Sequence, residues 1–234
     1  MHNVSLDNET LARIHKWRGS CHVFDHVDPL RTCHLVIDLQ NAYTQVGSAM
    51  HVPNADRVIP SVNLVSRALR DSGGINVFTR MTVTSQTWST WSVWLNDFCG
   101  AERREATVAA LSTGNTLHGL DSALDVLDQD LVWDKTRYSA FLPESDGFEE
   151  MLVSRGIDTL IISGTVTNCC CETTARDAMQ RNFRVLFLSD ATAALSDRDH
   201  NATLNNMLAI FADVRTAAST VDLICSAAVS GPVA

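Results

Sequence analysis

The sequence predicts an α/β fold, a doubly wound and mostly parallel sheet with helices on both faces. Short apolar runs rich in β-branched residues alternate along the chain with stretches whose apolar residues recur at helical spacing. The length of 234 residues, the 45% hydrophobic content and the low numbers of Gly and Pro (11 and 5) suit one large ordered domain. We expect an N-terminal extension over residues 1–30, the α/β domain over 31–217 and a C-terminal tail over 218–234.

The first half of the chain contains the signals for two helices and two strands. In order, we expect a short helix at 6–17 with Asp7 or Asn8 as its cap, a strand at 34–38, a helix at 55–69 and a strand at 75–79. The run Leu35-Val36-Ile37 is typical of a strand that is buried on both faces. The second helix carries an apolar face at Val58, Val62, Val65 and Leu69, and Gly73-Gly74 ends it.

The second half of the chain continues the alternation after an interruption. Residues 81–115 are irregular and rich in Trp, so we expect an insertion over the sheet. Further elements are expected in this order: a helix at 120–127, a strand at 131–134, a helix at 147–155, a strand at 159–163, a helix at 168–181, a strand at 185–189 and a helix at 200–211. Asp197, Asp199 and His200 are expected to cap the last of these helices. The apolar tail at 221–229 suits either a subunit contact or a final helix on the chain's own sheet.

Charge and cysteine content exclude several classes of protein. With 27 acidic and 18 basic residues, a formal charge of −9 and no long basic run, a nucleic-acid partner is not expected. The longest apolar runs are far below the ~18 residues of a membrane span, and no signal-peptide pattern opens the chain, so we expect a cytoplasmic protein without membrane contact. Seven cysteines without a C-x-x-C pair predict neither a disulfide framework nor a zinc knuckle.

Three segments place reactive side chains where parallel sheets gather their chemistry, at the carboxyl ends of the strands. Asp38 ends the first apolar run. Lys135 follows the predicted strand at 131–134, and Arg137-Tyr138 come two residues later. The segment 164–178 places three consecutive cysteines, 169–171, at the start of a helix, where the helix N-terminus favours a thiolate. Each feature also has an ordinary interpretation: an Asp that caps a turn, a solvated Lys and a buried packing Cys. Position alone does not choose among the cysteines.

Together, these segments resemble the isochorismatase-like cysteine hydrolase superfamily over roughly residues 31–217. The matching motifs are Asp38-Leu39-Gln40-Asn41-Ala42-Tyr43, then Lys135 followed by Ser139-Ala140-Phe141, and finally Gly164, Thr167-Asn168, Cys170 and Thr174-Ala175-Arg176-Asp177-Ala178. The register of the third motif selects Cys170 as the nucleophile and leaves Cys169 and Cys171 as packing residues.

The resemblance implies a catalytic triad of Asp38, Lys135 and Cys170. Asp38 would take the thiol proton, Lys135 would hold Asp38 ionised, and Cys170 would attack a carbonyl carbon to form a thioester. The backbone N–H groups of Thr167 and Cys170 would form the oxyanion hole, and a cis peptide bond is expected between Val166 and Thr167. The family's oligomers also imply a homo-oligomer, a dimer or a tetramer, to which residues 1–30 contribute contacts.

Within this superfamily, the sequence is most similar to the ureido and carbamoyl branch, which includes ureidoacrylate amidohydrolases, biuret hydrolases and N-carbamoylsarcosine amidohydrolases. The D-x-H pattern of the nicotinamidase metal site is missing, so we expect neither a metal nor another cofactor. The implied activity is cleavage of a small linear amide or ureido compound with release of ammonia. The candidate substrate-binding residues are Asn41, Tyr43, Trp88, Arg137, Tyr138 and Val166.

Several alternatives stay open at this stage. The chain could be a catalytically silent binding module of the same fold, a thiol redox protein, or a hydrolase of another small amide such as maleamate. Trp88, Trp91 and Trp94 suit either a cavity wall or a packing or subunit interface. Ligand-type residues at Cys21, His22, Asp25 and His26 would also allow a zinc site.

Overall fold

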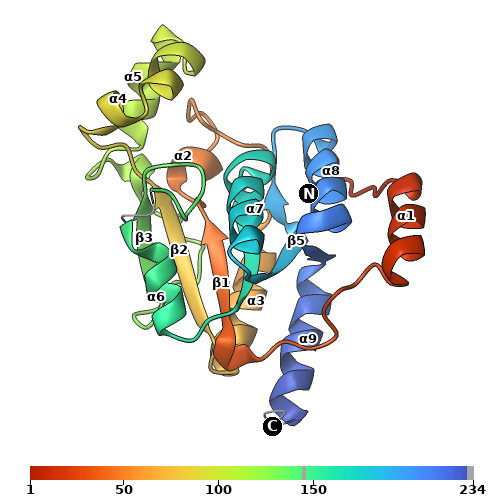
Figure 1. Ribbon diagram of the computed structural model, residues 1–234. Coiled ribbons are helices and arrows are strands. Elements are labelled where there is room, and N and C mark those ends of the chain that lie inside the picture. Colours follow the sequence, from red (N-terminus) through yellow and green to blue (C-terminus); the bar gives the residue numbers. More distant parts are fainter. Residues whose placement is uncertain (144–145, 231–234) are drawn as a thin grey trace.

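A parallel sheet forms the centre of the computed structural model, which describes residues 1–143 and 146–230, without the side chains of 227–230 (Figure 1). In this described part, the sheet has six strands, which are β1 (Thr32–Ile37), β2 (Ile75–Met81), β3 (Leu131–Lys135), β4 (Thr159–Thr165), β5 (Arg184–Ala193) and β6 (Asp213–Arg215). Their order is β3-β2-β1-β4-β5-β6, and all neighbouring strands are parallel. The predicted fold class is confirmed.

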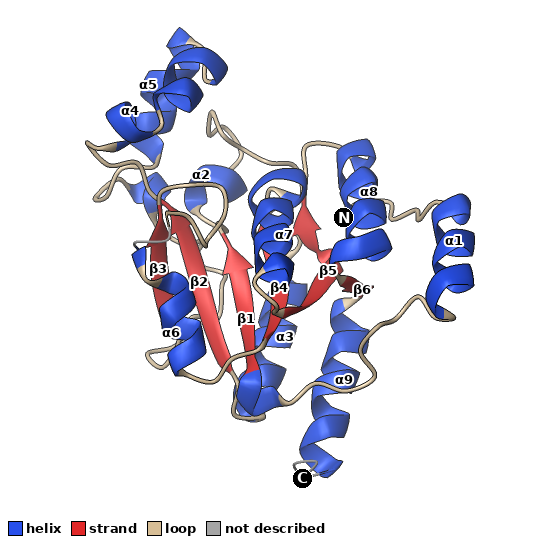
Figure 2. Cartoon of the chain, in the orientation of Figure 1, coloured by secondary structure: helices blue, strands red, loops and turns tan. Residues whose placement is uncertain are grey.

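Helices cover both faces of this sheet (Figure 2). On one face lie α3 (Ile59–Asp71) and α9 (Ala217–Ser230), which pack against each other. The other face carries α6 (Phe148–Ser154), α7 (Glu172–Gln180) and α8 (Asp197–Asn206). Every residue of β1 and β4 is buried between these layers, which explains the apolar runs Leu35-Val36-Ile37 and Leu160-Ile161-Ile162 within these strands. Of the two expectations for the C-terminal tail, the structure shows the helix that packs on its own chain.

The N-terminal extension also packs on its own chain. Helix α1 (Asn8–Arg18) is capped by Asp7, whose carboxylate accepts the Thr10 N–H at 2.8 Å. Arg18 donates to the Leu208 carbonyl at 2.7 Å, which fixes the helix against the π-helical turn η6 (Met207–Phe211) that follows α8. Figure 1 shows α1 beside α8. A subunit contact by residues 1–30 stays a prediction.

The predicted helix at 120–127 is wrong. This segment forms turns, and α3 supplies the partners for its backbone: the Asn63 amide donates to the Ala123 carbonyl and accepts the Asp125 N–H, at 2.8 and 2.9 Å. Asp121 also caps a local turn through the Ala123 N–H. Aspartates compete with the helical backbone in this way, and the apolar spacing at Leu120, Leu124 and Leu127 concealed it.

The predicted insertion at 81–115 is more regular than expected. It contains α4 (Thr87–Thr90), a π-helical turn η2 (Trp94–Phe98), α5 (Ala101–Ala110) and a 3₁₀ turn η3 (Thr116–His118). Helix α5 has no continuous apolar face, but its Ala, Glu and Arg residues are strong helix formers. Figure 1 shows α4 and α5 projecting beyond the end of β3.

Other boundaries differ by smaller amounts. Helix α3 begins at Ile59 instead of residue 55, because Pro60 fits the first turn of a helix. Helix α8 begins at Asp197, and its cap is Ser196, not Asp197, Asp199 or His200. Short turns at α2 (Asn41–Thr44) and η1 (Pro29–Arg31), as well as β6, were not predicted. Among the described residues, no helix is both long and apolar enough to cross a membrane.

Candidate active site

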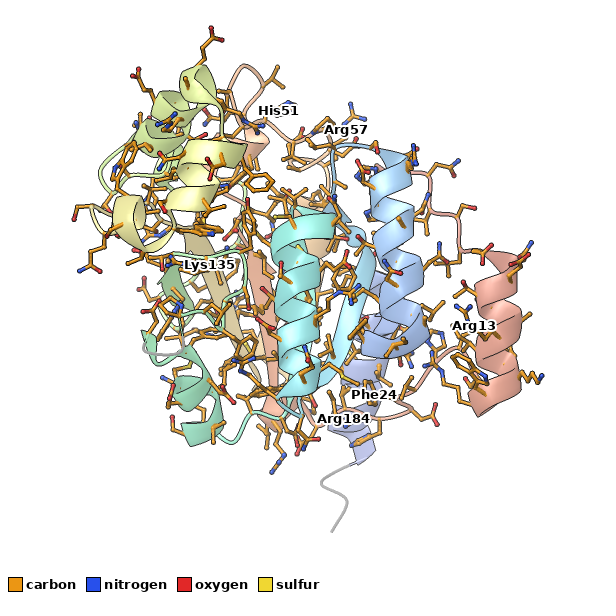
Figure 3. All side chains as sticks on the ribbon, turned by 45° about the horizontal axis from the view of Figure 1, so that its top comes forward. Arg13, Phe24, His51, Arg57, Lys135 and Arg184 are labelled. Carbon is orange, nitrogen blue, oxygen red and sulfur yellow. The ribbon has the colours of Figure 1, made fainter. Side chains whose placement is uncertain are left out.

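The strand order reverses between β1 and β4, and the three predicted triad residues lie at the carboxyl ends of the strands near this point. Asp38 directly follows β1, Lys135 ends β3, and Cys170 lies in the turn after β4. Figure 3 labels Lys135 beneath the helices of residues 87–110. Crevices at such a reversal are the usual ligand sites of open α/β sheets. The structure therefore brings the predicted triad together.

Asp38 is fully buried and held in one orientation. Its backbone has a φ of 51°, a left-handed conformation that costs a non-glycine residue about 1–3 kcal/mol and is concentrated at functional sites. The Thr79 hydroxyl donates to Oδ1 at 2.8 Å, and Lys135 Nζ lies 2.7 Å from Oδ2. Apart from this ion pair, Oδ2 accepts no hydrogen bond from the described residues. This oxygen is available to a neighbouring proton donor.

Lys135 is almost fully buried and is held by three contacts. Besides Asp38, its ammonium contacts the Arg137 carbonyl at 3.0 Å and the Met81 sulfur at 3.8 Å. Burial alone would lower the pKa of Lys135, but the negative charge of Asp38, joined by that of Cys170 whenever its thiol is ionised, outweighs burial and keeps the pKa above its ordinary value. Lys135 is therefore a permanent cation at this site.

A glycine allows β4 to approach β1 beside the nucleophile turn. Gly164 has a φ of 112°, and a Cβ atom there would lie 2.0 Å from the Ile37 carbonyl oxygen. Only glycine fits both conditions. The glycine of the third motif therefore keeps Asp38, which follows Ile37, next to the turn that carries Cys170.

That turn, η5 (Thr167–Cys171), is π-helical and continues into α7. π-helical turns are common at functional sites. Its three cysteines have different surroundings: Cys171 is fully buried, Cys170 lines a cavity although it is only 4% exposed, and Cys169 is half-buried and lines the same cavity. Geometry thus leaves Cys169 and Cys170 as candidate nucleophiles.

The charged pair and the neighbouring thiol both act on Cys170. Its pKa is raised because the thiol donates a hydrogen bond to the Cys169 sulfur and because it is buried, whereas Lys135 acts in the opposite direction. Asp38 lies close enough to raise this pKa further. Cys170 therefore rests as a thiol beside a carboxylate that can accept its proton.

The expected cis peptide bond is displaced by one residue. It lies between Thr165 and Val166, so the expectation of a cis bond between Val166 and Thr167 is wrong. Thr167 is fully buried and does not line the cavity, whereas Val166 does. The Thr167 hydroxyl is 3.0 Å from His200 Nδ1.

His200 has a single consistent protonation state at this position. Its Nε2 lies 3.0 Å from the Ser189 carbonyl, which can only accept, so Nε2 carries the hydrogen and Nδ1 accepts from Thr167. Burial, helped by the nearby His2, lowers the pKa of His200 to about 4. A neutral histidine on α8 thus fixes the start of the nucleophile turn.

A cavity of about 280 Å³ opens at Cys170. Its aromatic wall consists of Tyr43, Trp94, Phe98 and Tyr138, and its aliphatic wall of Met50, Val52, Met81, Val166 and Leu195. Polar groups come from Cys99, Arg103, Thr107 and Asn168. Burial raises the pKa of both tyrosines above the usual range, so their phenols are hydrogen-bond donors. The cavity suits a small molecule with one reactive carbonyl at the cysteine end.

Three of the six predicted substrate-binding residues line this cavity, namely Tyr43, Tyr138 and Val166. The other three, Asn41, Trp88 and Arg137, are not among its lining residues, and a role for them in substrate binding stays a prediction. The Asn41 amide donates to the Thr116 carbonyl at 2.9 Å, and Trp88 is 44% exposed.

Arg137 has partners of its own outside the cavity. It donates to the carbonyls of Thr136 and Thr90, at 2.8 and 3.0 Å, and its guanidinium lies over the Trp91 ring at 5.1 Å. Trp91 in turn stacks on Trp94. Arg137 therefore holds the segment that bears Trp94 instead of facing the cavity.

Two functional features escaped the sequence analysis. Arg103 of α5 lines the cavity, and Gln40 ties the end of β1 to β2 by accepting the Met81 N–H at 2.7 Å. The helix-forming composition of α5 was the available signal for Arg103, although it would not have placed the helix over the site. For Gln40, the motif around Asp38 was the signal.

Two of the four candidate zinc residues of the N-terminal segment have other side-chain partners. His22 Nδ1 lies 2.8 Å from Asp213, and the Cys21 sulfur lies 3.3 Å from His15. Within residues 1–143 and 146–230, no group of at least three His, Cys, Asp or Glu side chains is arranged to hold a metal ion. The four residues therefore do not assemble into a zinc site.

Comparisons with known proteins agree with this geometry. Residues 32–219 match the model of the isochorismatase domain. Nicotinamidase 3 of Arabidopsis thaliana is 32% identical over 180 residues, which cover 76% of this chain and 81% of the relative. A ureidoacrylate amidohydrolase of Methylobacterium radiotolerans is 29% identical over 198 residues, 79% of this chain and 76% of the relative. A cysteine hydrolase from Pseudomonas syringae pv. phaseolicola superposes with a TM-score of 0.75 at 26% identity, over 88% of this chain and 97% of that one.

Proposed function

The chain belongs to the isochorismatase family, and from this premise we propose that it is a cysteine amidohydrolase. It cleaves the C–N bond of a small linear amide or ureido compound through a thioester and releases ammonia. The observation that carries the proposal is the buried Asp38–Lys135 ion pair of 2.7 Å beside the Cys170 thiol at the end of a cavity. A buried ion pair costs desolvation energy that stability alone rarely explains.

The first half of the reaction begins with a proton transfer. Asp38 Oδ2 takes the proton of Cys170, and Lys135 stabilises the thiolate that forms. The sulfur attacks the carbonyl carbon of the amide, and the carbonyl π electrons move to oxygen. When this tetrahedral intermediate collapses, the C–N bond breaks, and the leaving nitrogen receives the proton from Asp38. Ammonia and a thioester on Cys170 result.

The second half repeats the same steps with water. Asp38 takes a proton from a water molecule, the hydroxide attacks the thioester carbon, and the C–S bond breaks. The Cys170 sulfur leaves as a thiolate and recovers the proton from Asp38. The product is a carboxylic acid, or a carbamate when a ureido group is cut.

The oxyanion formed in both halves needs backbone donors. The sequence predicted the N–H groups of Thr167 and Cys170. Because Val166 lines the cavity and Thr167 does not, we propose the Val166 N–H as the partner of Cys170 in this role. One such donor contributes about 3–4 kcal/mol to transition-state stabilisation in enzymes that use this device.

The experiment is a panel of small amides assayed for ammonia release. It contains biuret, ureidoacrylate, an N-carbamoyl amino acid, maleamate and nicotinamide, which separates the ureido branch from the activities named for the relatives. Cys170→Ala is the blank, and Cys225→Ala, which removes an exposed cysteine on α9, is the matched control. Turnover by the wild type and Cys225→Ala, but not Cys170→Ala, supports the proposal. A signal that survives Cys170→Ala contradicts it.

We further propose that the chain forms a homo-oligomer, as the family resemblance implies, and that it acts in the cytoplasm. The N-terminal extension exposes large apolar side chains at Trp17 and Leu30, which are 65% and 66% accessible in the single chain. Assembly would remove such surface from water. Light scattering on the purified chain measures the oligomeric state directly.

A further inference from the structure

The cavity of this acidic protein has a cationic wall. Among the described residues that line it, Arg103 is the only charged one and none is an Asp or Glu; in the single chain, Arg103 is also open to solvent. No described residue forms an ion pair or a hydrogen bond with the Arg103 guanidinium. The whole chain carries a formal charge of −9, so carboxylates to pair with an arginine are plentiful elsewhere.

We propose that Arg103 binds a carboxylate of the substrate, so that the enzyme selects small linear amides or ureido compounds that carry an acid group away from the scissile bond. The inference rests on the proposed function and adds the substrate class to it. A guanidinium binds a carboxylate through two parallel hydrogen bonds, which fixes the orientation of the bound molecule as well as its charge.

The elements of the cavity place the two ends of such a substrate on different parts of the chain. Cys170 lies at the sheet, in the turn after β4, whereas Arg103 lies in the first turn of α5. Thr107 follows Arg103 by one helical turn and lines the same cavity, so this face of α5 is the one that faces the substrate. A volume of about 280 Å³ between them suits a short linear molecule.

The other two cations near the site, Lys135 and Arg137, already have interaction partners within the protein. The charge of Lys135 is compensated by Asp38 at 2.7 Å. Arg137 donates to the Thr90 and Thr136 carbonyls and lies outside the cavity lining. This leaves Arg103 as the cation that meets a bound acid.

The test compares substrates that differ only in the remote group. Succinamate and succinamide share a scissile amide, as do N-carbamoylglycine and its amide. Arg103→Gln removes the charge, Arg103→Lys keeps the charge without the paired hydrogen bonds, and Arg104→Gln is the matched control. Arg104 is the neighbouring arginine of α5, bonded to Asn96 at 3.2 Å and absent from the cavity lining.

We expect the wild type and Arg104→Gln to prefer the acid of each pair by about tenfold to hundredfold in kcat/KM, the size of a charge-assisted hydrogen-bonded contact. Arg103→Gln should lose this preference through a higher KM for the acid, with little change for the neutral partner, and Arg103→Lys should keep part of it. The preference should also shrink at high salt. A wild type that cleaves the neutral partner equally well overturns the inference, as does an Arg103→Gln variant that keeps the preference.

A binding measurement separates this inference from the proposed function. The binding of succinate, the product-like dicarboxylate, and of neutral succinamide is measured by calorimetry with Cys170→Ala and with Cys170→Ala/Arg103→Gln. Succinate binding that depends on Arg103 supports the anion site even if no amide in the panel is cleaved, in which case only the proposed reaction fails. Equal binding of succinate to both proteins, or none to either, overturns the anion site.

Discussion

Two regions of the molecule meet at the cavity and differ in how they are built. The first region, called the sheet edge below, is the carboxyl end of the parallel strands. It carries Asp38 and Lys135 at strand ends and Cys170 in a turn, and all three side chains are buried. The segment 87–110 carries Trp94 and Arg103 on short helices that project beyond β3, and its Phe98 is 81% exposed (Figure 1). We infer from this difference that the buried sheet edge holds the reacting groups in place and that segment 87–110 determines which substrate binds.

The largest effect should come from the cysteine triplet. We expect Cys170→Ala to reduce kcat by at least about a thousandfold, because no other group forms the thioester. Cys169→Ala and Cys171→Ala should retain most activity, since neither sulfur bonds to the substrate. Steady-state ammonia release measures all three. An equal loss in all three variants would break the assignment of Cys170, and a selective loss in Cys169→Ala would move the nucleophile by one residue.

Lys135→Met tests whether the Asp38–Lys135 ion pair stabilises the sheet edge. The variant leaves the Asp38 carboxylate buried without its cation, which should lower the free energy of unfolding by about 3–5 kcal/mol and abolish turnover. Urea denaturation measures the stability. In the double variant Asp38→Asn/Lys135→Met, most of this stability should return while activity does not. A stable and active Lys135→Met protein would contradict the account.

The free energy of unfolding should fall in acid because of a buried histidine in the sheet. His34 is buried on β1 between the Ser66 and Ser163 hydroxyls, and burial lowers its pKa to about 3. The unfolded chain, with a histidine pKa near ~6.5, binds a proton that the folded chain does not. The free energy of unfolding is therefore fully present above pH ~6.5 and falls as the pH drops toward 3, by about 2 kcal/mol from this residue between pH 7 and pH 5.

His34→Gln is the matched variant for this effect, because glutamine can keep hydrogen bonds to the serines and does not titrate in this range. Its loss of stability between the two pH values should be smaller than that of the wild type by about 2 kcal/mol. Urea denaturation at both pH values gives the difference. An identical pH dependence in the two proteins would show that His34 already carries a proton in the folded state.

The smallest effects should lie in the outer segment, where two tryptophans make a matched pair. Trp94 lines the cavity and stacks on Trp91 with ring centroids 4.5 Å apart, whereas Trp88 is partly exposed and does not line it. We expect Trp94→Ala to lower kcat/KM by about tenfold, mainly through KM, and Trp88→Ala to change it by less than about twofold. Equal effects of the two substitutions on kcat/KM would contradict the assignment of Trp94, but not Trp88, to the cavity wall.

The same contrast explains what the sequence could predict. Asp38 and Lys135 drew notice because each follows or ends a strand of the predicted sheet, but it was the resemblance to the superfamily's motifs that predicted a triad of these two residues with Cys170. The outer segment was not recognisable in this way. Arg137 was expected to hold the substrate because it lies near Lys135 in sequence, but the Thr90 carbonyl, 47 residues away, holds it instead.

Arg103 shows the opposite error. In the sequence, it is one of two adjacent arginines between Glu102 and Glu105, a pattern typical of a solvated surface. Its place at the cavity depends on how α5 packs over the sheet, which short-range propensity does not encode. The helix expected at 120–127 failed for a related reason, because side chains of α3 supply the hydrogen bonds that a helix would have formed internally.

The identity of the acylated sulfur tests the central claim most directly. The enzyme is quenched with acid during turnover of a cleaved amide, digested with trypsin and analysed by tandem mass spectrometry; cleavage after Arg155 and Arg176 leaves all three adjacent cysteines in one peptide. The account predicts an acyl group on Cys170 that is absent from the Cys170→Ala protein. An acyl group on Cys169 would contradict it.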